Sequence, residues 1–422
     1  MPVLGRSRPR VVVLHHPHSF PPLHLFEHAR SVADLVWAVG VGAPSTQDDH
    51  RLLAKFGAVM DLTGKTEDET ASALAHYQPD GIVTFVDHNL EACAAVAARL
   101  GLPFHSPEVA ATLVDKRRQR ALLAKAGVPG PRAWPLNDDF TSSDITDLAV
   151  RLPYPCVLKP ARGSGSRNVY AIGCTDELVS TLAAQHRPEA WLVEEMLLDD
   201  PHQERWHSSF ASVESVVTAG DVSHLAVTGR LPVEPPFRET GSFVPGVLEG
   251  IPSDALLSMA TRAIEALQIN WGMVHTEIKA TPAGLAILEV NGRLGGLVPY
   301  ILGRVSAVDL FQVAFLVAAG GRPRPPAAQG SAGLVPCDGV GFWALFPPPL
   351  SAHRVESVSG IDELLAIPGI DDVLLHRAQG DGVDWREGFS SNVASVTGRA
   401  DDHADMQKTL RAARTTLKVT FS

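Results

Sequence analysis

The residues whose types and spacing best suit chemistry lie in the stretch GMVHTEIKATPAGLAILEVNGRLGG, residues 272–296. Two apolar runs flank a three-residue loop, 282–284, which is typical of a β-hairpin. A loop centred on Ala283 places Glu277 directly opposite Glu289. Carboxylates in such positions have Cβ atoms about 4.5–5.5 Å apart and repel each other, so we expect a cation between them.

The same register sorts the hairpin side chains onto two faces, because successive strand residues point to opposite sides. One face carries polar side chains, namely His275, Glu277, Lys279, Glu289, Asn291 and Arg293. The other carries Val274, Thr276, Ile278, Ala286, Leu288 and Val290. Two carboxylates and an amide oxygen are hard ligands that suit Mg²⁺, and Arg293 suits a phosphoryl oxygen. The alternative is a solvated face on which Lys279 relieves the repulsion.

A second chemical motif is YPCVLKPARGSGSRNVYAIG, residues 154–173, in which a lysine precedes a glycine-rich loop. In a P-loop the glycines come first and a helix follows. Here strand-like runs lie on both sides, so the loop joins two strands. Lys159 can then reach a phosphate from its strand while the backbone N–H groups of Gly163, Ser164, Gly165 and Ser166 close over it. The alternative is an ordinary glycine turn beside a surface lysine.

The 422-residue chain is long enough for two or three domains that position these motifs. Strands alternating with helices over about the first hundred residues predict a parallel α/β domain, without the glycine fingerprint of dinucleotide binders. A helix-rich connector ends at Gly127, and GGRPRPPAAQG, residues 320–330, reads as a linker before a mixed tail.

Composition and charge exclude several classes of partner. The formal net charge of −11 argues against nucleic acid and anionic membranes, which require clustered basic residues. The four cysteines have no metal or redox spacing, which suits a reducing cytosol. No apolar stretch is long enough to span a bilayer. We therefore expect a cytoplasmic protein.

Taken together and in order, the motifs resemble those of the ATP-grasp enzymes, in particular the carboxylate–amine ligase branch that contains the L-amino acid ligases. The matching pieces, from about Asp115 to Phe315, are DKRRQRALLAKAGVPGPR, LPYPCVLKPARGSGSRNVYAI, WLVEEML, GRLPVEPPFRETGSFVPGVL, VHTEIKATPAGLAILEVNGRLGG and VDLFQVAF. The resemblance implies an α/β and α+β multidomain chain with the ATP-grasp fold. Its expected units are a Rossmann-like, parallel α/β pre-ATP-grasp domain (1–112), a small lid subdomain with the connector helix (113–205), a large subdomain with the metal site (206–322) and a small C-terminal α+β domain (323–422).

The resemblance also implies roles for individual residues. Lys116, Lys159 and the Gly163–Ser166 loop would contact the nucleotide phosphates, and the hinge Glu194, Glu195, Met196 and Leu197 would hold adenine. Glu277, Glu289 and Asn291 match the metal ligands. Arg293, His275 and Lys159 match catalytic positions near the transferred phosphoryl group and the acyl phosphate. One departure is LDDPHQERWHSSF after the hinge, which leaves the ribose contact open among Asp199, Asp200 and Glu204.

The activity implied by the resemblance is ATP-dependent ligation of a carboxylate to an amine through an acyl phosphate, with release of ADP and phosphate. ATP and two Mg²⁺ ions, for which Mn²⁺ substitutes, would be the cofactors. The substrates would be an amino acid or small carboxylic acid and an amino acid or amine, and a homodimer is usual for the family. Arg230, Glu239 and Arg304 are candidates for holding charged substrate groups, with ordinary surface charge as the alternative.

Three alternatives to this function stay open. The first is an ATP-grasp carboxylase or formyl-transfer enzyme, although the chain lacks a biotin-carrying Met-Lys-Met segment. The second is a non-catalytic nucleotide-binding protein, against which the complete set of motif residues argues. The third is a metal hydrolase built from the early histidines, for which no Asp or Cys partner completes a site. These histidines are His15, His16, His18, His24 and His28, and they could instead line a substrate pocket.

Overall fold

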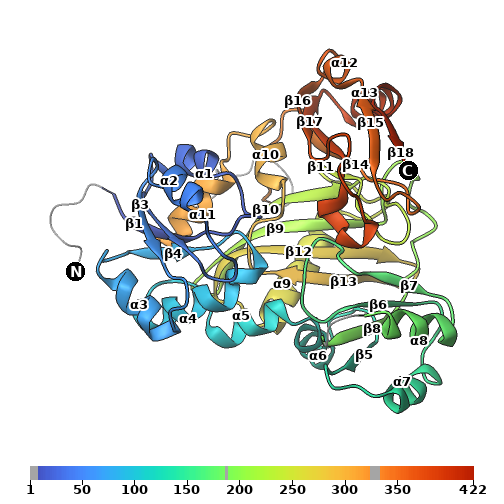
Figure 1. Ribbon diagram of the computed structural model, residues 1–422, viewed down its shortest axis with the longest axis horizontal. Coiled ribbons are helices and arrows are strands. Elements are labelled where there is room, and N and C mark those ends of the chain that lie inside the picture. The colour runs from blue at the N-terminus through green and yellow to red at the C-terminus, as the bar shows by residue number, and fades with distance from the viewer. Residues whose placement is uncertain (1–7, 186–188, 324–332) are drawn as a thin grey trace.

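The computed structural model describes residues 8–185, 189–323 and 333–422, which form three β-sheets and a two-stranded ribbon with helices packed around them (Figure 1). Most of the predicted linker at 320–330 lies outside the described residues. Within the described ranges, no helix is both long and apolar enough to cross a bilayer.

The N-terminal sheet is parallel, as predicted, with the order β3 (Ala58–Asp61), β2 (Asp34–Val39), β1 (Arg10–Leu14), β4 (Gly81–Val83). Its helices are α1 (Pro22–Ala29), α2 (Gln47–Leu53), α3 (Glu67–Ala75) and α4 (Leu90–Leu100), and the short helix η1 (Asp87–Asn89) follows β4. Strand β1 is apolar and buried on both sides because helices cover both faces of such a sheet. Chain order leads from β1 towards β2 on one side and returns to β4 on the other, so the topological switch point lies between β1 and β4.

The connector consists of α5 (Pro107–Val114) and α6 (Lys116–Lys125). Asp115 caps α6, since its side chain accepts a hydrogen bond from the Arg117 N–H at 3.0 Å. A four-stranded sheet follows, with the order β5 (Ala133–Leu136), β8 (Trp191–Glu195), β6 (Cys156–Pro160), β7 (Tyr170–Ile172). Helices α7 (Ser142–Ala149) and α8 (Thr175–Ala183) share its apolar core. The glycine-rich loop joins β6 to β7, which confirms that it connects two strands.

The largest sheet is antiparallel and has the order β13 (Gly284–Asn291), β12 (Trp271–Thr281), β9 (Phe210–Thr218), β10 (Asp221–Arg230), β11 (Gly241–Val244), β14 (Val340–Phe346), β17 (Ala394–Ala400), β16 (Ile370–Leu375). Helices α9 (Ser253–Ala266), α10 (Val298–Gly303) and α11 (Leu310–Ala318) pack along it, and α11 also contacts β4 of the N-terminal sheet.

The C-terminal region continues the large sheet through β14, β17 and β16. Its other elements are β15 (Val355–Ser359), α12 (Ile361–Leu365), the 3-10 segment η2 (Trp385–Ser391), α13 (His403–Thr416) and β18 (Lys418–Phe421). The division of the chain at 112, 205 and 322 stays a prediction.

The β12–β13 hairpin confirms the predicted Glu277–Glu289 pair but not the predicted turn. Only residues 282 and 283 form the turn, because Thr281 pairs with Gly284, and a bulge at Leu288 restores the register. The extra residue reverses the alternation between the bulge and the turn. Ile287 is therefore the fully buried residue opposite Ile278, and our assignment of Ala286 and Leu288 to the apolar face is wrong.

Candidate active site

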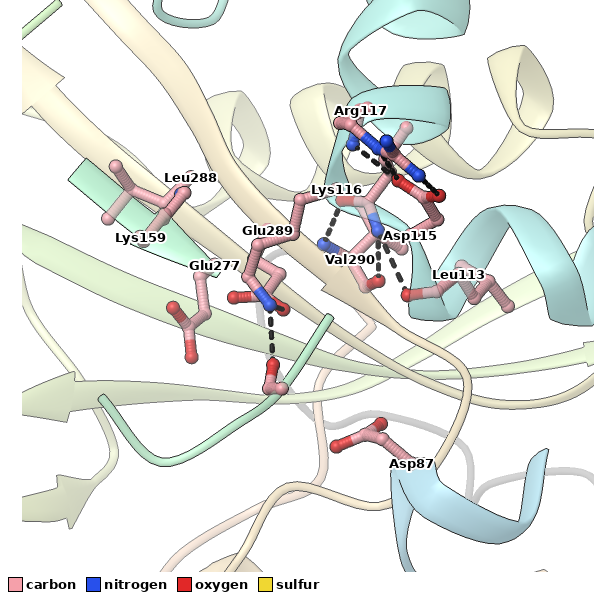
Figure 2. A network of polar contacts seen from close by, with 12 residues as sticks. Asp87, Leu113, Asp115, Lys116, Arg117, Lys159, Glu277, Leu288, Glu289 and Val290 are labelled. Atoms are coloured by element: carbon pink, nitrogen blue, oxygen red, sulfur yellow. Dashed lines mark hydrogen bonds and ion pairs between the residues drawn. The ribbon is translucent and has the colours of Figure 1, made fainter. Parts of the chain in front are cut away.

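The two hairpin carboxylates are neutralised by different groups from those expected. Lys279 does not serve them, because its Nζ lies 2.8 Å from Asp199 Oδ1. Lys116, at the first position of α6, places its Nζ 3.0 Å from Glu289 Oε1. Figure 2 shows Lys116 reaching Glu289 beside Glu277. The hairpin is therefore a built polar site and not a solvated face.

Glu277 is held ionised by cationic neighbours. Its Oε1 lies 3.3 Å from His275 Nε2 and 3.8 Å from Arg230 Nη2. Burial alone would raise the pKa of this carboxyl, but the hydrogen bond from His275 and the nearby charges of His275 and Arg230 outweigh burial and lower it. Glu277 is thus available as an anionic ligand at neutral pH.

The donor set fits a hard divalent cation. It comprises the carboxylates of Glu277 and Glu289, which face one another, and the buried amide of Asn291. Across the described residues, no three His, Cys, Asp or Glu side chains gather to hold a metal by themselves. A set of two carboxylates and one amide suits Mg²⁺, which takes one or two protein carboxylates and completes its shell with waters and substrate phosphates.

His275 has a buried partner that sequence reasoning missed. Its Nδ1 lies 2.5 Å from Glu214 Oε1, and Glu214 Oε2 also accepts a hydrogen bond from the Gly295 N–H at 3.2 Å. Burial would lower the pKa of His275, but Glu214 and then Glu277 raise it to about 9. The available signal was a single carboxylate in the apolar strand FASVESVVT, which needs a partner when buried.

Arg293 is oriented by the N-terminal sheet. Asp87, in η1, accepts two hydrogen bonds from this guanidinium, at 2.9 Å from Nε and 2.7 Å from Nη2. Burial would lower the pKa of Arg293, but Asp87 outweighs that effect and raises it. Figure 2 shows Asp87 on η1, near the hairpin carboxylates. Sequence reasoning missed Asp87, whose signal was its position soon after a buried parallel strand.

Lys159 is buried in an ion triad. Glu194 Oε2 lies 2.7 Å from Lys159 Nζ, and Glu194 Oε1 lies 2.6 Å from Arg120 Nε. Burial would raise the pKa of Glu194, but Arg120 and Lys159 lower it to about 2. Arg120, which was not predicted, also donates to the carbonyls of Ile287 and Leu288 and so ties α6 to β13.

The predicted adenine hinge begins within β8. Glu194 belongs to the buried triad, whereas Glu195 pairs with Arg132 at 2.6 Å. Met196 and Leu197 follow the strand. Of the ribose candidates, Asp199 pairs with Lys279 and Asp200 accepts a hydrogen bond from the His202 N–H, while Glu204 is exposed. The adenine and ribose assignments stay predictions.

The glycine-rich loop, Gly163–Ser166, lies between α6 and the C-terminal region. Lys116 Nζ donates to the Gly163 carbonyl at 2.5 Å, and the Phe389 N–H donates to the Gly165 carbonyl at 2.8 Å. The Asn168 N–H donates to the Arg386 carbonyl at 2.9 Å, so η2 holds Gly165 within the loop and the segment that follows the loop. No local pattern in the sequence indicated this contact.

The three predicted substrate residues do not all meet. Arg230 is buried, and its Nη1 donates to Ser212 Oγ at 3.1 Å while its Nε lies 3.5 Å from Glu239. Arg230 Nη2 also lies 3.8 Å from Glu277 Oε1, and the charge of Glu277 acts on Glu239. Arg304 instead forms ion pairs with Asp371 and Asp372 of β16. A substrate would therefore have to displace these two carboxylates to bind Arg304.

The early histidines do not form a metal site within the described part of the chain. His24 Nδ1 lies 2.9 Å from the Tyr300 hydroxyl, and His28 pairs with Asp309 at 2.6 Å. Nothing in their geometry supports the metal-hydrolase alternative.

Residues 113–297 match the family described as ATP-grasp domain, so the chain carries an ATP-grasp domain. The fold is the ATP-grasp fold: an L-amino acid ligase from Bacillus licheniformis aligns over 99% of this chain and 100% of its own, with a TM-score of 0.75 and 18% identity.

Two curated relatives are similar in sequence. Carnosine synthase 1 of Gallus gallus is 29% identical over 61% of this chain and 30% of its own length, and alanine–anticapsin ligase of Bacillus subtilis is 25% identical over 58% and 55%. The chain thus matches about a third to a half of these relatives' lengths.

Proposed function

We propose that the protein is an ATP-dependent carboxylate–amine ligase that forms an amide bond and releases ADP and phosphate. The observation that carries this proposal is the convergence of Lys116, Glu277, Glu289 and Arg293 on one site within the ATP-grasp domain. The printed names of the two relatives, a synthase of carnosine and an alanine–anticapsin ligase, support the same class of chemistry.

In the proposed reaction, a substrate carboxylate oxygen attacks the γ-phosphorus of ATP, the bond from that phosphorus to the bridging oxygen breaks, and ADP leaves. The amine nitrogen then attacks the carbon of the resulting acyl phosphate. The new C–N bond forms as the C–O bond to phosphate breaks, and the amine proton passes to solvent or to the departing phosphate. Atoms and charge balance without an oxidant or reductant.

The side chains of the site divide this work. Arg293, fixed by Asp87, offsets charge on the transferred group, and buried Lys159 acts similarly from the lid. His275, protonated between Glu214 and Glu277, directs both ring N–H groups to these carboxylates and adds positive charge beside the acyl group. Glu277, Glu289 and Asn291 would hold magnesium, which when bound screens the phosphates. Binding of two magnesium ions, and replacement of Mg²⁺ by Mn²⁺, are part of the same proposal.

We also propose that the substrates are a small carboxylate and an amine. The protein would act on them as a homodimer. The carboxylase alternative has a basis in fold alone, because solved N5-carboxyaminoimidazole ribonucleotide synthetase from Thermotoga maritima aligns at 15% identity with a TM-score of 0.67. It predicts dependence on bicarbonate in place of an organic acid, because carboxyphosphate would take the role of the acyl phosphate while a nitrogen nucleophile is still required.

The test is product analysis with Mg-ATP, pooled amino acids and small carboxylates. We expect ADP and phosphate only when an acid and an amine are both present, together with an amide of matching mass. Stimulation by bicarbonate in the presence of an amine, with no organic acid needed, would favour the carboxylase. Nucleotide binding without turnover in any pool would favour the non-catalytic alternative.

A further inference from the structure

Three histidines gather at the switch point of the N-terminal sheet, outside the groups used above. His16 follows β1, and His88 lies in η1 after β4. The rings of His16 and His88 stack with centroids 5.2 Å apart, and those of His16 and His18 lie 5.3 Å apart. Ligands of open parallel α/β sheets bind at this position, outside the carboxyl ends of the strands.

The cluster is a buried imidazole between two exposed ones. His16 is only 4% exposed, whereas His18 and His88 are exposed. Asn89, fully buried, donates to the Leu14 carbonyl at 3.1 Å and so fixes η1 against the end of β1. Its Oδ1 has no hydrogen-bond partner in the described structure.

The hydrogen bonding of His16 defines what it can offer a ligand. Its Nδ1 accepts from the His18 N–H at 3.1 Å, so the neutral ring carries its proton on Nε2. Burial, and then the neighbouring His88, His18 and His15, lower the pKa of His16 to about 4, which keeps it a neutral donor. No side-chain hydrogen bond within the described residues engages His18 or His88, so the ring nitrogens of both remain available to hydrogen-bond a ligand.

The position of the histidine cluster indicates which group of the substrates it would bind. His88 directly follows Asp87, which holds Arg293, so the cluster adjoins the place where the acyl phosphate would form. The carboxylate of the acid substrate becomes part of the amide bond and is no longer free. An amino acid that reacts through its α-amine keeps its carboxylate, which must be bound without reacting.

We propose that His16, His18 and His88 form the subsite for the free carboxylate of the amine substrate, which is therefore an amino acid. The inference rests on the proposed ligase function and adds the class of its amine substrate.

The kinetic test compares wild type, the double variant His18→Ala/His88→Ala and the control His76→Ala, which changes an exposed histidine elsewhere in the same domain. Acceptors are pooled L-amino acids and their α-amides. Losing two hydrogen bonds to the substrate carboxylate should raise KM for the amino acids about tenfold in the double variant, with kcat and KM for the amides nearly unchanged. An unchanged preference for amino acids over amides would overturn the subsite while leaving the ligase function intact.

A binding measurement separates failure of the subsite from failure of the ligase. We would follow histidine ring NMR signals of the wild type during addition of glycine, glycinamide or O-phosphoethanolamine, with the double variant for assignment. Shifts of the His18 and His88 signals with glycine alone support the subsite even if no turnover is found. No shift with glycine, an equal shift with glycinamide, or a shift with the phosphate compound alone would refute a carboxylate subsite.

Discussion

The substitution Gly388→Ala tests whether the C-terminal region positions the glycine-rich loop. Gly388 has φ +60° and ψ −125°, and a Cβ atom there would lie 2.0 Å from the Gly165 carbonyl oxygen. An ordinary contact is at least 3.4 Å, so the loop must retreat. That movement breaks the 2.8 Å hydrogen bond from the Phe389 N–H to Gly165.

The magnitude follows from two separable costs. The positive φ makes alanine unfavourable by about 1–3 kcal/mol, which lowers the melting temperature. The displaced loop acts on nucleotide binding, where a misplacement of about 1 Å can cost about 10²-fold, or roughly 2.7 kcal/mol. The control Gly380→Ala also introduces a Cβ at positive φ, +92°, but meets nothing within 4 Å. It should lower stability without the loss in kcat/KM for ATP.

The assay combines ADP release at varied ATP with tryptic cleavage after Arg167, an exposed residue that directly follows the loop. We expect Gly388→Ala to lose about 10²-fold in kcat/KM for ATP and to be cut faster than Gly380→Ala. Gly165→Ala, whose Cβ would lie 3.2 Å from Phe389 Cβ, probes the same contact from the loop and should show a smaller effect. Wild-type ATP kinetics and cleavage rates in a folded Gly388→Ala protein would refute the positioning role of η2.

Further substitutions test the buried partners. Asp87→Asn should lower kcat at least tenfold, because Arg293 loses its ion pair, while KM for ATP changes little; an unchanged kcat would remove Asp87 from the account. Glu214→Gln removes the largest influence raising the pKa of His275 from 6.5 to about 9, so the alkaline limb of the kcat profile should move to lower pH; an unmoved limb would show that the charge of His275 is not needed. Glu194 has a pKa of about 2 against an ordinary 4.5, so its stabilisation, on the order of 3 kcal/mol, is present above pH 4.5 and lost as pH falls towards 2. The difference in unfolding free energy between wild type and Glu194→Gln should shrink across that window, and a constant difference would contradict the ion-triad account.

Local patterns in the sequence predicted the elements that position the site. Buried apolar runs predicted the parallel strands of the first sheet, and the register predicted the facing pair Glu277 and Glu289. The bulge at Leu288 was not predictable, because nothing in the local sequence distinguishes a two-residue turn with a bulge from a three-residue turn.

The partners of the predicted residues were beyond local patterns, because they come from distant segments. Asp87 reaches Arg293 from the N-terminal sheet, and Arg120 reaches Glu194 from the connector. The contact of η2 with the loop joins residues more than two hundred positions apart. Such pairs depend on how the sheets pack, which periodicity does not specify.

The most direct measurement of the central claim is the identity of the nucleotide product in reactions of the wild type and Glu289→Gln with Mg-ATP, pooled acids and pooled amines. The account predicts ADP and phosphate in equal amounts with an amide product, and loss of all three in Glu289→Gln while the variant keeps the wild-type melting temperature. Formation of AMP and pyrophosphate, or undiminished turnover by the variant, would contradict it.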